Sequence, residues 1–178
     1  MNRFIVNCII SGVAGGVLSH TAAAACSRAE NARSGLAMED VSHIAWGDDP
    51  RSPGRRTHTN WVVGAALHHG ASIFWATFFE TFFGKNAERS TASAIVGGTT
   101  IAAGAYLTDY HVVSDRFKPG FEAHLSNTSL FLVYAGLAAG LAAAARLRGL
   151  YRHQIENRNE RNKRRNSQRG PDAVVTPE

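Results

Sequence analysis

A continuous apolar stretch from Trp61 to Phe83 limits the folds open to this chain more than any other feature. As a helix it would be about 34 Å long, and the hydrocarbon core of a bilayer is about 30 Å thick. His68, His69 and Glu80 lie inside this stretch. Polar groups are costly in hydrocarbon, so those found there usually have a structural or functional role.

Three further apolar blocks cover residues 4–26, 91–113 and 129–145. The mean hydropathy of −0.16 hides this segregation, because the polar residues concentrate in a loop and a C-terminal tail. A length of 178 residues suits one domain. The sequence therefore predicts an all-α protein, with a four-helix transmembrane bundle over residues 1–148.

Two polar segments complete the prediction. In the loop over residues 27–60, the part from Leu36 to Trp46 has the apolar spacing of a short amphipathic helix, which we expect at the membrane interface with Trp46 as its anchor. The tail over residues 149–178 is polar and basic; its first part could prolong the fourth helix, and we expect residues 157–178 to be disordered.

The basic residues are divided unequally between the two predicted sides of the membrane. Twelve of the 19 lysines and arginines lie at the N-terminus, between the second and third spans, or from Arg146 onward. The positive-inside rule then predicts a multi-pass membrane protein with both termini in the cytoplasm and residues 27–60 outside. The simplest partner for the basic tail is anionic lipid, whereas nucleic acid is disfavoured because no aromatic residues interleave the charges.

The first block leaves two interpretations open. Arg3 and the alanines before Cys26 resemble parts of a signal peptide, but the apolar run is longer than usual, which favours a retained first helix. Small-residue pairs such as Gly12 with Gly16, and Gly136 with Gly140, predict close helix packing within one chain or in a homo-oligomer through glycine and alanine faces.

Polar residues converge on the predicted external side. Seven of the 8 histidines fall there or in the outer half of the spans. A metal site would need ligands from separate segments, such as His43, His69 and Asp109, and a b-type haem would need two histidines such as His20 and His68. No HExxH or paired CxxC motif supports either group, and interhelical hydrogen bonds are the simpler use of these side chains.

Glu80 is the acid of the second apolar stretch. A lone carboxylate in a helix bundle must be protonated or paired. Lys85, five residues later, is one candidate partner. Alternatively, Glu80 and His69 lie on one helix face and could line a proton path.

Three blocks of sequence resemble a family of small four-helix bacterial inner-membrane proteins without an assigned function. They are Ser42–Asp48, His68–Glu80 and Asp109–Ser126, with the patterns SHxxWGD, HHxxSxFWAxxFE and DYxxVxxRxxPGFExxLS. The resemblance implies a four-helix membrane protein and no particular activity. As candidate site residues, it favours most members of the polar cluster given in the next sentence and disfavours His20, His111 and His124. The candidate polar cluster comprises His43, Trp46, Asp48, His68, His69, Glu80, Asp109, Arg116 and Glu122.

These observations favour a non-enzymatic membrane protein. Its polar cluster would hold the external loop against the helices, with Arg116 pairing with Asp48, Asp109 or Glu122. Two alternatives remain: a metal- or haem-binding membrane protein, and a small proton-linked transporter component using Glu80 and His69. The sequence contains no phosphate-binding loop and no GxSxG nucleophile motif. A protein without a cofactor is therefore the simplest expectation.

Overall fold

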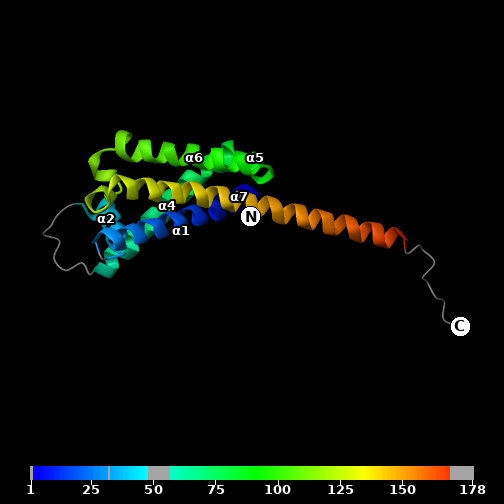
Figure 1. Ribbon diagram of the computed structural model, residues 1–178, viewed down its shortest axis with the longest axis horizontal. Helices are drawn as coiled ribbons and strands as arrows, with labels where there is room; N and C mark the ends of the chain where they lie inside the picture. Colours follow the sequence, from blue (N-terminus) through cyan, green and yellow to red (C-terminus); the bar gives the residue numbers. More distant parts are fainter. Residues whose placement is uncertain (1, 32, 48–56, 169–178) are drawn as a thin grey trace.

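The computed structural model describes residues 2–31, 33–47 and 57–168, and within these ranges it contains helices and no strands. Figure 1 shows the longer helices lying side by side, with short helical turns at their connections. The elements are α1 (Arg3–Asn31), α2 (Leu36–Val41), α3 (His43–Trp46), α4 (Thr57–Phe82), α5 (Gly84–Arg89), α6 (Thr91–Leu107), the π-helical turn η1 (Thr108–Val112), the 3₁₀ turns η2 (Asp115–Phe117) and η3 (Phe121–Ala123), and α7 (Asn127–Gln168).

The long helices alternate in direction along the chain. α7 packs against α1 on one side and against α6 on the other, and α4 packs mainly against α1. Figure 1 places α2 at one end of the bundle, hereafter the cap end, together with the connection from η1 to η3. The opposite end, hereafter the tail end, carries α5 and the start of α1, and α7 projects beyond it.

Three of the helices are long and apolar enough to cross a membrane, namely α1, α4 and α7. The predicted span at residues 91–113 differs, because α6 contains only 17 residues and ends at Leu107. The helix then widens into the π-turn η1, where its polar residues begin. Thr108 donates its hydroxyl to the Gly104 carbonyl at 2.8 Å at this junction.

Glycines allow α1 and α7 to approach closely. A Cβ atom on Gly140 would overlap the backbone of Ala14 and Gly15, and one on Gly136 would lie 2.8 Å from the Leu18 carbonyl oxygen. The small-residue pair predicted on α7 is therefore used for packing within one chain. Any contact with a second copy would have to use other surfaces.

The prediction of a disordered tail is wrong for residues 157–168. α7 is a single helix of 42 residues that runs through the predicted boundary at residue 148 and continues to Gln168. Arginine, lysine, glutamate and glutamine have high helix propensity. An extension of a helix already held in the bundle also avoids the cost of nucleation. Residues 169–178 lie outside the described part of the chain.

The predicted amphipathic helix is present as α2, followed directly by α3. Ala37, Met38 and Val41 of α2 are buried at the cap end. They pack in a cluster with Phe121 of η3, Leu125 of the connection before α7, Ala23 of α1, and Leu130 and Val133 of α7. The first loop therefore covers the bundle through an apolar contact rather than through polar contacts alone.

Gly64 on α4 lies directly against the backbone of this cap. A Cβ atom there would overlap the Met38 carbonyl oxygen, whereas a Cβ on Gly70 of the same helix would meet nothing within 4 Å. We expect Gly64→Ala to displace α2 and to lower thermal stability in detergent. Gly70→Ala should be neutral or slightly stabilising, because alanine is preferred to glycine in a helix by about 1 kcal/mol. Equal melting temperatures for the two variants would contradict this packing.

Candidate functional site

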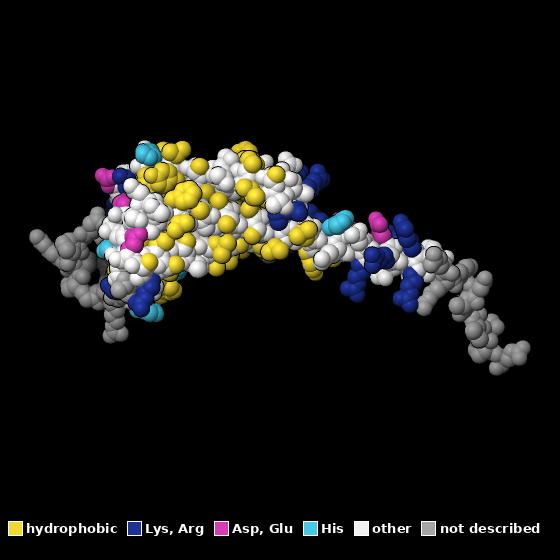
Figure 2. Space-filling model, in the orientation of Figure 1, with side chains coloured by type: hydrophobic (Ala, Val, Ile, Leu, Met, Phe, Trp, Pro, Cys, Tyr) yellow, Lys and Arg dark blue, Asp and Glu magenta, His cyan; other side chains and the backbone are white. Residues whose placement is uncertain are grey.

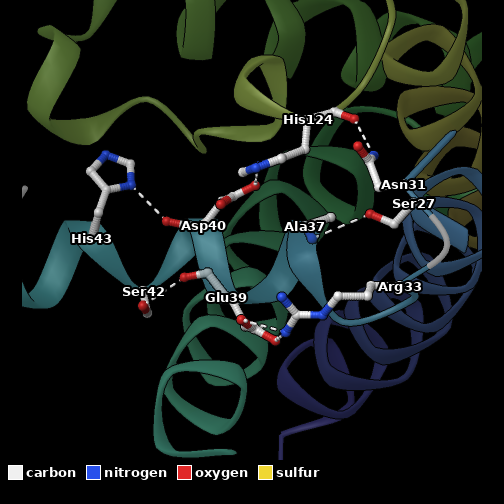
Figure 3. A network of polar contacts seen from close by, with 9 residues as sticks. All are labelled: Ser27, Asn31, Arg33, Ala37, Glu39, Asp40, Ser42, His43 and His124. Carbon is white, nitrogen blue, oxygen red and sulfur yellow. Dashed lines mark hydrogen bonds and ion pairs between the residues drawn. The ribbon is translucent and has the colours of Figure 1, made fainter. Parts of the chain in front are cut away.

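At the cap end, α2 is tied to the connection that precedes α7 (Figure 3). His124 Nδ1 lies 2.8 Å from an Asp40 carboxylate oxygen, and the side chain of Asn31 donates to the His124 carbonyl at 2.6 Å. His43 Nδ1 lies 2.7 Å from the Asp40 carbonyl oxygen and donates to it. Gly120, with φ of +80°, turns the chain beside His43. Side chains from three separate segments therefore meet around Asp40.

A second carboxylate, Glu30 at the end of α1, receives the start of α7. One Glu30 oxygen accepts hydrogen bonds from the hydroxyls of Ser129 and Ser126 at 2.5 and 2.7 Å. The other accepts from the Ser126 backbone N–H at 2.9 Å. A negative charge at a helix N-terminus is favourable because of the helix dipole. Glu30 thus fixes the start of α7 to the end of α1.

The predicted polar cluster is brought together only in part. Arg116 does not pair with Asp109 or Glu122, and instead approaches the Ile44 carbonyl at 3.5 Å. Asp109 accepts a hydrogen bond from the Tyr134 hydroxyl at 2.7 Å, and Glu122 is exposed on η3. Trp46 is 39% exposed at the end of α3. Asp48 lies outside the described residues.

A cavity of about 250 Å³ lies beneath the cap, between the helices. His68, Asp109 and Tyr134 are among its polar lining groups, with Ser19 and Ser72. The other lining residues are mostly apolar: Val41, Ile44, Leu67, Ala71, Trp75, Ala105, Phe117, Pro119, Phe121, Val133 and Leu137. His68 and Asp109, which the sequence analysis considered separately, therefore line the same cavity.

His68 and His69 lie beside His20, which the resemblance disfavoured as a site residue. The His20 ring lies 6.2 Å from the His68 ring and 5.7 Å from the His69 ring, edge to face. Trp61 packs against His20 at 5.6 Å. His69 donates from Nδ1 to the Ala65 carbonyl at 2.9 Å, and His68 Nε2 lies 3.3 Å from the Gly16 carbonyl. These histidines make the interhelical and backbone contacts expected of structural side chains.

The metal ligands considered from the sequence do not form a site. His43 bonds to α2, His69 lies among the histidines of α1 and α4, and Asp109 bonds to α7. Across residues 2–31, 33–47 and 57–168, no group of three or more His, Cys, Asp or Glu side chains could hold a metal ion.

At the tail end, Glu80 is buried in an ion pair that joins three helices. Its side chain is 3% exposed, and its Oε1 atom lies 2.5 Å from Arg148 Nη2 of α7. The Ser11 hydroxyl of α1 donates to the same oxygen at 2.5 Å and accepts from Arg148 Nη1 at 2.8 Å. The carboxylate that looked alone in the sequence is therefore paired and hydrogen-bonded.

Glu88 of α5 extends this network toward the surface. Its carboxylate accepts from Arg152 at 2.6 Å, and Arg148 Nε lies 3.5 Å away. Arg146 donates to the Glu88 carbonyl and, from Nε, to the Thr91 hydroxyl at 3.1 Å. The network consequently attaches α7 to α1, α4, α5 and the start of α6.

Lys85 is not the partner of Glu80. Lys85 is exposed, and Glu80 instead bonds to a residue 68 positions later. The sequence separation hides this pairing, because Arg148 falls just after the fourth apolar block and reads as part of the tail. Its one visible signal is its place within two turns of that block, where a long side chain can reach back along the bundle.

No family model, curated protein or solved structure matches this chain. The resemblance carried by the three sequence blocks therefore stays a prediction, and the function must be argued from the geometry alone.

The ion pair between Glu80 and Arg148 should dominate the stability of the tail end. Arg148→Met would leave Glu80 buried without its partner, and breaking such pairs typically costs about 3–5 kcal/mol. The double variant Glu80→Gln with Arg148→Met should recover part of the loss. Lys85→Met is the matched control and should change little, because that side chain is exposed. Denaturant unfolding in detergent measures all four proteins, and a loss for Lys85→Met as large as that for Arg148→Met would contradict the pairing.

Stability at the cap end should depend on the protonation of Asp40. Burial raises the pKa of the Asp40 carboxyl above its ordinary value, and the hydrogen bond and charge of His124 offset this only in part. A raised pKa in the folded state means that the contribution of this carboxyl to stability is lost as pH rises through that pKa. The melting temperature of Asp40→Asn minus that of the parent should therefore increase between pH 4 and pH 6. A difference that falls over this range would show that the pairing with His124 outweighs burial.

Proposed function

We propose that this protein is a non-enzymatic membrane scaffold that displays a long basic helix at one membrane face. One observation carries the proposal: α7 is a single helix of 42 residues, and the buried Glu80–Arg148 network holds it where it leaves the bundle. Beyond Arg152, residues 153–167 are exposed. The projecting segment is therefore supported by the bundle without being covered by it.

The proposed placement follows the segregation of charge. The bundle would cross a bacterial inner membrane four times, with α6 and η1 together forming the third span. Figure 2 shows apolar side chains along the flank of the bundle, acidic side chains mainly at the cap end and basic side chains along the projecting helix. By the positive-inside rule, the tail end and both termini would face the cytoplasm.

The scaffold proposal is preferred to a transporter because of how the polar groups are used. Glu80 is already neutralised by Arg148, so a proton carried there would have to break a buried ion pair. His69 lies at the middle of α4, eleven residues before Glu80, among the rings of His20 and His68. The polar contacts described above join helices to each other, which is the role expected of a scaffold.

Rigid display of α7 can be tested by spin labelling. With Cys8 and Cys26 replaced by alanine, labels at Asn86→Cys and Asn162→Cys would report the position of the projecting helix relative to α5. We expect a narrow distance distribution in the parent, because the Glu80–Arg148 network holds α7 between the two labelled positions. Arg148→Met should broaden it, whereas Arg161→Met on the exposed segment should not. A broad distribution in the parent, or equal widths in both variants, would contradict the proposal.

A further inference from the structure

An apolar groove runs between α6 and α7 on the flank of the bundle. Its volume is about 700 Å³ and its surface is almost entirely apolar. The lining residues include small side chains such as Ala103 and Ala139, which leave it open, and larger ones such as Phe131 and Tyr106. With this volume and apolar lining, the groove can hold a hydrocarbon chain.

The same face of α7 continues into a basic groove at the tail end. Ala138, Ala142, Arg146, Gly149 and His153 follow one another at spacings of three or four residues, so they form one stripe along the helix. The first two line the apolar groove, and the last three line a second groove of about 510 Å³. About one helical turn separates Ala142 from Arg146. The two grooves are therefore neighbours along α7.

The basic groove has an excess of positive charge. Glu88, one of its two acids, is already bound by Arg148 and Arg152. Arg146 is held in place by the Glu88 carbonyl and the Thr91 hydroxyl, which occupy only part of its fork of five donors. Arg89 also lines the groove and is exposed, and no ion pair involves it within the described ranges.

We propose that these grooves together bind one anionic phospholipid. Its acyl chain would lie between α6 and α7, and its phosphate would lie at Arg89 and Arg146. Basic pockets between helices on the cytoplasmic side are suited to acidic headgroups because they combine charge with a nearby apolar wall. The inference rests on the membrane placement proposed above, and it assigns a defined site in addition to a general attraction between the basic tail and anionic lipid.

Native mass spectrometry of the full chain in detergent can measure this binding by titration with phosphatidylglycerol or phosphatidylcholine. We expect tighter binding of phosphatidylglycerol. Arg89→Gln should weaken phosphatidylglycerol binding about fivefold, as expected for one basic residue near an anionic surface, and leave phosphatidylcholine unchanged. Ala139→Phe, which fills the apolar groove, should weaken both lipids.

Two matched controls separate a site from diffuse attraction. Lys85→Gln removes an exposed charge at the same end outside the groove lining, and Ala143→Phe enlarges an exposed alanine of α7 that does not line it. Both should bind as the parent does. Equal affinity for the two lipids, an effect of Lys85→Gln as large as that of Arg89→Gln, or a dimer abolished by Ala139→Phe with lipid binding unchanged would overturn the lipid site.

Failure of the membrane placement itself has a different signature. A chain that alkaline carbonate releases from membranes without detergent would overturn that placement, and the lipid site with it. A chain that resists carbonate but binds both lipids equally would overturn only the lipid site.

Discussion

The buried ion pair between Glu80 and Arg148 is the constraint on which the arrangement of the helices depends. Removing two charges from water is costly, and the cost is offset only when the pair is close and its other donors and acceptors are satisfied. Here the Ser11 hydroxyl bonds to both partners, and Glu88 shares the guanidinium and binds Arg152. Because this geometry must be met by residues of α1, α4, α5 and α7 at once, it sets the register of these helices. It also determines the point at which α7 leaves the bundle.

The cap end is fixed in a different way. There the backbone of α2 at Met38 packs directly on Gly64 of α4, and a cluster of buried apolar side chains joins α2, η3, α1 and α7. The polar contacts around Asp40 and Glu30 surround this cluster and join segments that are far apart in the sequence. The cavity that contains His68, Asp109 and Tyr134 exists because α2 and η3 rest on the helices without filling the space between them.

The long helices could be predicted because the length of an apolar run is a local property of the sequence. The same is true of α2, whose apolar spacing is visible between residues 36 and 46. The partners of the polar residues could not be predicted in this way. Arg148 is 68 residues from Glu80, and His124 is 84 residues from Asp40, so only the packing of the helices brings them together. The projecting part of α7 was missed because its polar composition was interpreted as disorder, although most of its residues favour helix once the helix has begun.

The continuity of α7 has a mechanical consequence. Near its start the helix is bound to Glu30 through Ser126 and Ser129, about midway it is bound to Glu80 through Arg148, and beyond that point it projects alone. With a length of about 63 Å, it forms a lever whose fulcrum is the buried ion pair. A force on the projecting arm is therefore transmitted to both attachments. The cap end and the tail end are thus connected through one rigid helix.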